Sequence, residues 1–423
     1  MPVSMSVTPF ESLGAIWEET PAILNASPLA ELYDENLLFT LACSAADRWR
    51  NHALADMSDV RVLTETGSVT PGFLSDRLPN RSDRDFHTYL DRASEKGSDF
   101  NLTINSLQQF SPQLFDRLVH ANDLVLRLAK TTPGGVSDCH MIAGVYREAP
   151  TRVHKDTASV ITMVVSGSKR FYLWPFEFFT DIAGPQSADQ QTNLDIDYRL
   201  WIEDATVLDL RAGDLAYWPS SYWHCATSDG MPHVSLHIAN YMVADPAAEL
   251  AFASRSILER NLEGTPTIAN HARRPDGAAV LTESWREALR ELAGSNELEI
   301  AVRARVLKRT STANFEVVPT SASDESPGLD QLVDGIRRPS LDEFCLARSG
   351  VRVILLCCMG QVVQLVGRAG LADFLSSLYG LRSTINDIQK NLKALDADLS
   401  ADEALRIISL MLRVGVLETV DYA

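Results

Sequence analysis

Residues 138–243 constrain the fold of this chain more than any other part, because they consist of short β-rich segments separated by Gly, Pro and Asp. Ser166-Gly-Ser168 separates two such segments in a pattern that predicts a hairpin, and Arg211-Ala-Gly-Asp214 separates two more as a second tight turn. Many short strands at regular spacing are typical of an antiparallel sandwich or barrel. The expected strands are Val160–Val165, Arg170–Trp174, Val207–Leu210, Leu215–Trp218 and His233–Val243.

Helical periodicity dominates on both sides of this block. Residues 9–130 are mostly of this type, with apolar positions three to four apart in Leu37–Trp49 and Ser111–Ala129, and the pattern returns over 246–262. The last segment predicts a hairpin of Val351–Cys358 and Gln361–Val366, then three helices and a strand, which is the order of a winged helix. The predicted domains are 1–245 (barrel with N-terminal helices), 246–318 (helical), 319–328 (linker) and 329–423 (winged helix).

Charge and cysteine content narrow the possible partners and compartment. The 423 residues carry a formal net charge of −18, which argues against broad binding to nucleic acid or to an anionic membrane, and a basic peptide is the more compatible partner. The six cysteines form no CxxC pair, so a disulfide framework is not expected. The N-terminus lacks a signal-peptide pattern, and the longest apolar run, Val351–Met359, contains Arg352 and is short. A cytoplasmic protein that does not enter the membrane is predicted.

A possible metal site is formed by His154, Asp156 and a distant His224. Alternate residues of a strand point to one face, so a His-x-Asp pair and a histidine from a neighbouring strand present two nitrogens and one oxygen on one side of a metal. Such a facial set suits non-haem Fe(II), which needs open positions for a cosubstrate and O₂. Chance alone gives about one His-x-acid pair at this composition, so the pair is informative only because it opens a strand in the β-rich block.

Several further residues complete a pattern that resembles JmjC/cupin-type Fe(II)- and 2-oxoglutarate-dependent oxygenases. The chain contains Thr151-Arg-Val-His154-Lys-Asp156, Gly167-Ser-Lys169-Arg170, Tyr222-Trp-His224 and Ile238-Ala-Asn240. Order and spacing are similar to those of the ribosomal oxygenases and of the asparaginyl hydroxylase of the hypoxia pathway. The resemblance implies an α+β fold: a double-stranded β-helix (jelly roll) with helical flanks, a helical middle region and a C-terminal winged helix.

The resemblance also implies roles for individual residues. His154, Asp156 and His224 are the expected Fe(II) ligands, and Lys169 pairs with the distal carboxylate of 2-oxoglutarate. Thr151 is expected to share that carboxylate, and Asn240 is the polar residue of the closing strand. Val160 stands where the asparaginyl hydroxylase has an Asn, and Thr162, on the same strand face, is the candidate substitute.

The function predicted from these features is hydroxylation of a protein or peptide side chain with release of succinate and CO₂. The substrate is a ribosomal-peptide precursor or a ribosomal protein. The domain order of the ribosomal oxygenases implies a homodimer, and the last unit is also similar to winged-helix peptide-recognition domains. Three alternatives stay open: a non-catalytic cupin-type peptide-binding scaffold, a cupin that carries another metal such as Zn²⁺ or Mn²⁺, and an N-methyl-lysine demethylase. His140, His233 and His237 are interpreted as packed or surface-exposed residues and not as a second metal site, and Trp218 as part of the core.

Overall fold

The computed structural model describes most of the chain, and it divides into two compact units. One comprises residues 1–244 with 313–320, and the other comprises 245–312 with 321–423. The described residues are 7–51, 60–64, 67–68, 75–94, 99–184, 190–243, 250–251, 253–255, 257–258, 283–319, 331–346 and 349–420. Most of the helix expected over 246–262, and the predicted linker beyond Pro319, lie outside these ranges.

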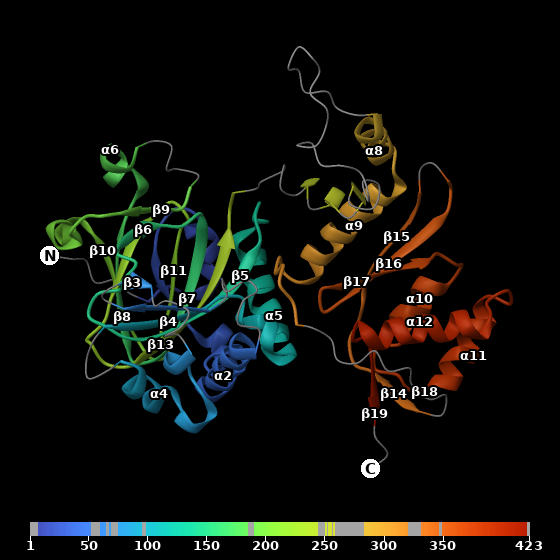
Figure 1. Cartoon of the computed structure of the whole chain (residues 1–423), viewed down its shortest axis with the longest axis horizontal. Helices are drawn as coiled ribbons and strands as arrows, with labels where there is room; N and C mark the ends of the chain where they lie inside the picture. Colours follow the sequence, from blue (N-terminus) through green and yellow to red (C-terminus); the bar gives the residue numbers. More distant parts are fainter. Residues whose placement is uncertain are drawn as a thin grey trace. The chain divides into compact units, whose positions relative to one another are not determined.

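Two antiparallel sheets form the first unit (Figure 1). The larger sheet contains, in spatial order, β1 (Ala22–Leu24), β11 (Leu215–Trp218), β7 (Ala158–Ser166), β13 (His233–Tyr241), β5 (Ser137–Val145), β4 (Phe100–Ile104), β2 (Val60–Thr64) and β3 (Gly67–Ser68). The smaller contains β10 (Thr206–Arg211), β8 (Ser168–Trp174), β12 (Trp223–Thr227), β6 (Val153–Lys155) and β9 (Thr192–Leu194). Inward side chains of both sheets share one apolar core, as in a jelly roll.

The hairpin predicted around Gly167 is wrong, although both predicted tight turns are present. β7 belongs to the larger sheet and β8 to the smaller one, and β10 and β11 are likewise divided between the sheets. Gly167 and Gly213 both have positive φ, as tight turns require, so each turn carries the chain from one sheet across to the other. The local sequence therefore encodes the turn, and closure of the barrel decides which strands pair.

Residues 9–130 were expected to be mostly helical, but they also supply four strands of the larger sheet, β1 to β4. Val60–Thr64 and Phe100–Ile104 are rich in β-branched and aromatic residues, and they pair antiparallel with each other. The helices over the expected segments are confirmed as α2 (Glu35–Asn51) and α5 (Pro112–Ala129), and α4 (Phe86–Ala93) lies between them. Short helical elements complete the unit: α1 (Leu13–Ile16), α6 (Thr180–Ala183), η1 (Phe10–Ser12), η2 (Ser27–Leu32), η4 (Arg81–Asp83), η5 (Leu107–Phe110), η6 (Phe176–Phe179) and η8 (Tyr198–Asp204).

Each sheet is covered on its outer face. α5 begins at the N-cap Ser111, which accepts a hydrogen bond from the Leu114 amide, and it buries a face that includes Leu118 and Asn122. Asn122 bonds to residues of β5 and β13, so α5 lies on the larger sheet. η6 and η8 supply aromatic side chains that pack on the outer face of the smaller sheet around Trp174 and Trp223. The interior between the sheets is thereby shielded.

The second unit contains two small sheets and several helices. One sheet has the order β18-β14-β19 and the other β15-β16-β17. The predicted hairpin is confirmed, because β16 and β17 pair antiparallel around Met359-Gly360. α12 begins with a capping box of Ser400 and Glu403. The winged-helix assignment stays a prediction.

The helices and strands of the second unit are, in chain order, α8 (Glu283–Ala293), α9 (Asn296–Ser311), β14 (Leu332–Gly335), β15 (Ser340–Cys345), β16 (Arg352–Cys358), β17 (Gln361–Val366), α10 (Leu371–Ser377), β18 (Arg382–Thr384), α11 (Ile385–Leu395), α12 (Ala401–Arg413) and β19 (Leu417–Val420).

Within the described parts of the chain, no helix has both the length and the apolar character needed to cross a bilayer.

Candidate metal centre

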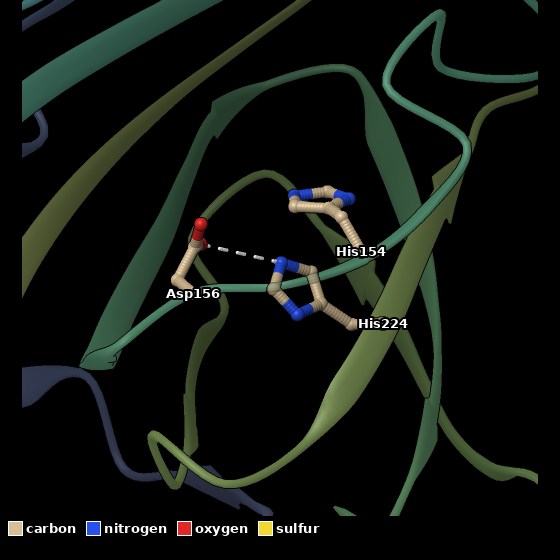
Figure 2. A group of neighbouring side chains, drawn as sticks. All are labelled: His154, Asp156 and His224. Atoms are coloured by element: carbon tan, nitrogen blue, oxygen red, sulfur yellow. Dashed lines mark ion pairs between the residues drawn. The ribbon is translucent and has the colours of Figure 1, made fainter. Parts of the chain in front are cut away.

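The three predicted metal ligands converge at one point of the smaller sheet (Figure 2). His154 on β6 and His224 on β12 are direct antiparallel partners, and their ring centroids are 4.2 Å apart. Asp156 follows the end of β6, and its Oδ2 lies 3.6 Å from Nε2 of His224. One ligand atom from each residue falls within 4.8 Å of the others, so the three groups can bind one ion.

Backbone carbonyls orient both imidazoles. Nδ1 of His154 lies 3.0 Å from the Arg152 carbonyl, and Nδ1 of His224 lies 3.3 Å from the Tyr222 carbonyl. A carbonyl only accepts, so both Nδ1 atoms carry the proton and both Nε2 atoms keep a free lone pair. Arg152 has a left-handed backbone (φ 55°), a costly conformation for a side chain of this size, and it is held by an ion pair with Asp195.

The electrostatics of the three groups also suit metal binding. Burial lowers the pKa of His224 to about 3, and the neighbouring His154 acts in the same direction. Burial tends to raise the pKa of Asp156, but His154 and His224 together bring it below its usual value. His224 is therefore neutral and Asp156 ionised at neutral pH, which are the protonation states that ligate a metal.

Lys169 is fully buried in the barrel interior on β8. Its Nζ donates a 3.0 Å hydrogen bond to Oγ of Ser235 on β13, and it lies 5.4 Å from the ring centroid of Phe171. Within the described residues, no carboxylate forms an ion pair with Lys169. Burial lowers the pKa of this ammonium to about 7, because the charged form is poorly solvated. A buried cation whose partner is a neutral hydroxyl is suited to receive an anion.

Three buried polar atoms of the barrel have no hydrogen-bond partner in the described structure: Oγ1 of Thr162, Nε1 of Trp218 and Nε2 of His233. Thr162 shares a strand face with Val160 and Val164, which belong to the core between the sheets. The Trp218 ring lies 5.2 Å from that of His224. Buried polar groups are normally satisfied, so unpaired ones in one interior indicate the place of a polar ligand.

Two residues predicted to contact the cosubstrate lie elsewhere. Asn240 points to the outer face of β13, where it exchanges hydrogen bonds of 3.1 and 3.0 Å with Asn122 and accepts a third, of 2.6 Å, from Ser137. The Asn240 amide therefore joins α5 to the sheet instead of facing the interior. Thr151 is exposed in the turn before β6, so its hydroxyl is not among the buried polar groups around Lys169.

Ser235 and His237 are interior residues that the sequence interpretation missed. They alternate with Val234 and Leu236 on β13, so both point inward, and Oγ of Ser235 lies 2.9 Å from Nε2 of His237. The ring of His237 stacks on His140 of β5, with centroids 4.9 Å apart. The alternation of polar His233, Ser235 and His237 with apolar residues was a usable signal for a polar strand face.

Comparison with known families now identifies the fold. Residues 43–242 match the family model described as a cupin-like domain. This part of the chain, a little under half of its length, is similar to cupin-like domains. The predicted α+β cupin fold with antiparallel sheets and helical flanks is therefore confirmed, and the resemblance stated from the sequence is supported. No curated protein matches the chain.

Solved structures of the Escherichia coli ribosomal oxygenase YcfD are among those similar to this chain. A crystal structure of that protein has 13% sequence identity and a TM-score of 0.47, covering 99% of this chain and 100% of the other. A structure of YcfD in complex with cobalt and 2-oxoglutarate has 12% identity and a TM-score of 0.42, with 96% of each chain covered. Similarity at this level does not assign a substrate or an assembly to the cupin-like chain.

Proposed function

We propose that this cupin-like protein is an Fe(II)- and 2-oxoglutarate-dependent dioxygenase that hydroxylates a side chain of a protein or peptide. The observation that carries the proposal is the presence, in one barrel, of a two-histidine, one-carboxylate set with free ligand atoms and of a buried lysine that pairs with no carboxylate of the described residues. Each feature alone is common, but together they provide for a metal and for a dicarboxylate.

The donor set fits Fe(II). Two imidazole nitrogens and one carboxylate oxygen, from His154, His224 and Asp156, suit this ion and leave its remaining coordination positions open. When bound, Fe(II) with 2-oxoglutarate supplies the oxidising chemistry, in which O₂ is consumed, 2-oxoglutarate loses CO₂ to give succinate, and one oxygen atom enters a substrate C–H bond.

The chain's own residues bind and orient the reactants. Lys169 is placed to pair with the distal carboxylate of 2-oxoglutarate, and the unpaired Thr162 hydroxyl can donate to the same group. The apolar side chains between the sheets, such as Val164 and Leu210, exclude water from this carboxylate, which strengthens the ion pair.

The substrate class follows from charge and domain order. The net charge of −18 favours a substrate with basic residues over a nucleic acid. In this proposal the C-terminal unit, predicted as a winged helix, holds the substrate's leader segment or a second copy of the chain in a homodimer.

The deciding experiment is mass spectrometry of candidate peptides produced together with the full-length protein. A gain of one oxygen supports the hydroxylase, and loss of a methyl group with release of formaldehyde supports an N-methyl-lysine demethylase. His154→Ala and Asp156→Ala are expected to abolish the modification. Asp209→Asn is the matched control, because Asp209 is an exposed carboxylate of the same sheet that pairs with Arg170. An unchanged modification in the two ligand variants would refute the proposal.

Binding separates the enzyme from a scaffold. Fe(II)-loaded protein titrated with 2-oxoglutarate without oxygen is expected to develop a visible charge-transfer band. Iron-loaded protein without this band, or a protein that retains only Zn²⁺ or Mn²⁺, would favour the non-catalytic peptide-binding alternative.

A further inference from the structure

A chain of three buried side chains runs across the barrel interior from β8 to β13. Nζ of Lys169 lies 3.0 Å from Oγ of Ser235, and the same Oγ lies 2.9 Å from Nε2 of His237. All three side chains are buried, and none is a metal ligand.

The direction of the first hydrogen bond follows from the chemistry of the groups. The Lys169 ammonium can only donate, so the Ser235 oxygen is the acceptor of that bond. The Ser235 hydroxyl can then donate its own proton to Nε2 of His237 when that nitrogen carries none. Burial, and then the nearby Lys169, keep the pKa of His237 well below its usual value, in agreement with a neutral ring.

The direction of this chain has a consequence for the cosubstrate site. With its proton donated to His237, Ser235 does not donate to an incoming carboxylate. Ser235 instead accepts a hydrogen bond from one N–H of Lys169. This bond fixes the position of the ammonium group at the end of the lysine side chain, which otherwise has four rotatable bonds. The other two N–H groups of the ammonium are left to face the anion.

We propose that Ser235 and His237 are positioning residues that preorganise Lys169 for the distal carboxylate of 2-oxoglutarate. This inference rests on the proposed function. His237 sets the direction of the Ser235 hydroxyl, Ser235 holds the ammonium, and the conformational entropy of the lysine is lost on folding and not on binding. His140 supports His237 by stacking on its ring.

Ser235→Ala tests the middle of the chain. We expect affinity for 2-oxoglutarate, titrated without oxygen into Fe(II)-loaded full-length protein, to fall about tenfold, the usual effect of one hydrogen bond to a charged group. Affinity for Fe(II) itself should not change. Ser235→Thr keeps the hydroxyl and should restore most of the binding. Ser159→Ala is the control, because Ser159 is a buried serine on β7 that bonds to Glu18 outside the barrel interior.

A pair of variants at His237 separates orientation from packing. His237→Gln keeps a hydrogen-bond acceptor for Ser235 but loses the ring, whereas His237→Phe keeps a ring against His140 but loses the acceptor. We expect the Gln variant to bind 2-oxoglutarate within about threefold of the wild type and the Phe variant to bind about tenfold more weakly. The opposite order would show that His237 acts only through packing and would overturn its part of the proposal.

The outcomes distinguish this inference from the function on which it rests. If the wild-type protein loaded with Fe(II) does not bind 2-oxoglutarate, the proposed function fails. If the wild type binds it and Ser235→Ala binds it equally well, the dioxygenase stands and the positioning role is refuted. A thermal melt of each variant shows that a weakened affinity does not come from unfolding, and Ser159→Ala should lose stability without losing affinity.

Discussion

Replacement of Lys169 by Met should make the protein more stable when metal and cosubstrate are absent. Met fills a similar volume without a charge, and burial lowers the pKa of Lys169 from 10.5 to about 7. Each pKa unit corresponds to about 1.4 kcal/mol, so the buried ammonium costs about 5 kcal/mol at a pH below both values. Loss of the hydrogen bond to Ser235 offsets about 1 kcal/mol of this. A net gain of roughly 3–4 kcal/mol in the free energy of unfolding is expected.

The sign of the pH dependence follows from proton binding. Folded Lys169 releases its proton near pH 7, whereas in the unfolded chain it keeps the proton until its ordinary pKa of 10.5. Between these two values the unfolded state binds more protons, so the stability of the wild type rises with pH. The advantage of the Met variant should therefore be full below about pH 7 and should disappear near pH 10. The neighbouring titratable groups are His233 and His237 on β13 and His140 on β5.

Urea unfolding followed by tryptophan fluorescence measures this difference. Six of the seven tryptophans lie in residues 1–244 and one, Trp285, lies in the other unit, so the signal reports mainly on the barrel. Wild type and Lys169→Met are compared at about pH 6 and about pH 9.5, a choice set by the two pKa values. The Met variant should also fail to bind 2-oxoglutarate. Equal or lower stability of the Met variant at the lower pH would refute the view that Lys169 is an unpaired buried cation.

Four further results are expected. Thr162→Val should stabilise the ligand-free protein by about 1 kcal/mol, because it removes a buried unpaired hydroxyl, and should weaken 2-oxoglutarate binding; thermal melts and the anaerobic titration check both signs. Asn240→Ala should cost about 3 kcal/mol in urea unfolding but leave 2-oxoglutarate affinity unchanged, since its amide bonds to Asn122 and Ser137 on the outer face of β13. Asp156→Asn should reduce Fe(II) affinity in equilibrium dialysis by more than the roughly 10–100-fold typical of outer-shell changes. Affinity for 2-oxoglutarate should fall by up to about tenfold per pH unit above about pH 7, because binding then requires Lys169 to take up a proton, which calorimetry in buffers of different ionisation enthalpy detects.

The grouping of the three candidate metal ligands was predictable because their arrangement depends mainly on local rules. Strand alternation places His154 and Asp156 on one side of the chain, and a histidine on an adjacent strand completes the set. The structure adds the register, in which His154 and His224 are direct partners, and the carbonyls that orient the rings. Neither can be read from spacing, because the strands β7 to β11 lie between β6 and β12 in the sequence.

The pairing of strands was not predictable from the turns. Gly167 adopts a positive φ as a hairpin would require, but a Cβ there would lie 2.5 Å from the Pro232 carbonyl and 2.7 Å from Cβ of His233. The glycine is therefore needed for the turn and also for the close approach of the chain that enters β13. The local turn sequence cannot distinguish these two requirements for glycine, because the close approach depends on Pro232 and His233, more than sixty residues away in the sequence.

The residues proposed to lie around the cosubstrate could likewise not be chosen from the local sequence alone. The sequence of β13 is His233-Val-Ser-Leu-His-Ile-Ala-Asn240. His233, Ser235 and His237 lie on one face of the strand and Asn240 on the other, so one of these two sets must face away from the barrel interior. The sequence interpretation chose Asn240 by analogy, whereas the structure places Ser235 and His237 inside. Asn122 explains why Asn240 faces outward. It lies on the buried face of α5, and its side-chain amide exchanges two hydrogen bonds with the amide of Asn240 on the outer face of the sheet. An amide buried on an apolar helix face requires a polar partner, and Asn122 and Asn240 are each other's partners. The other polar residues of β13 therefore face the interior, where Ser235 contacts Lys169.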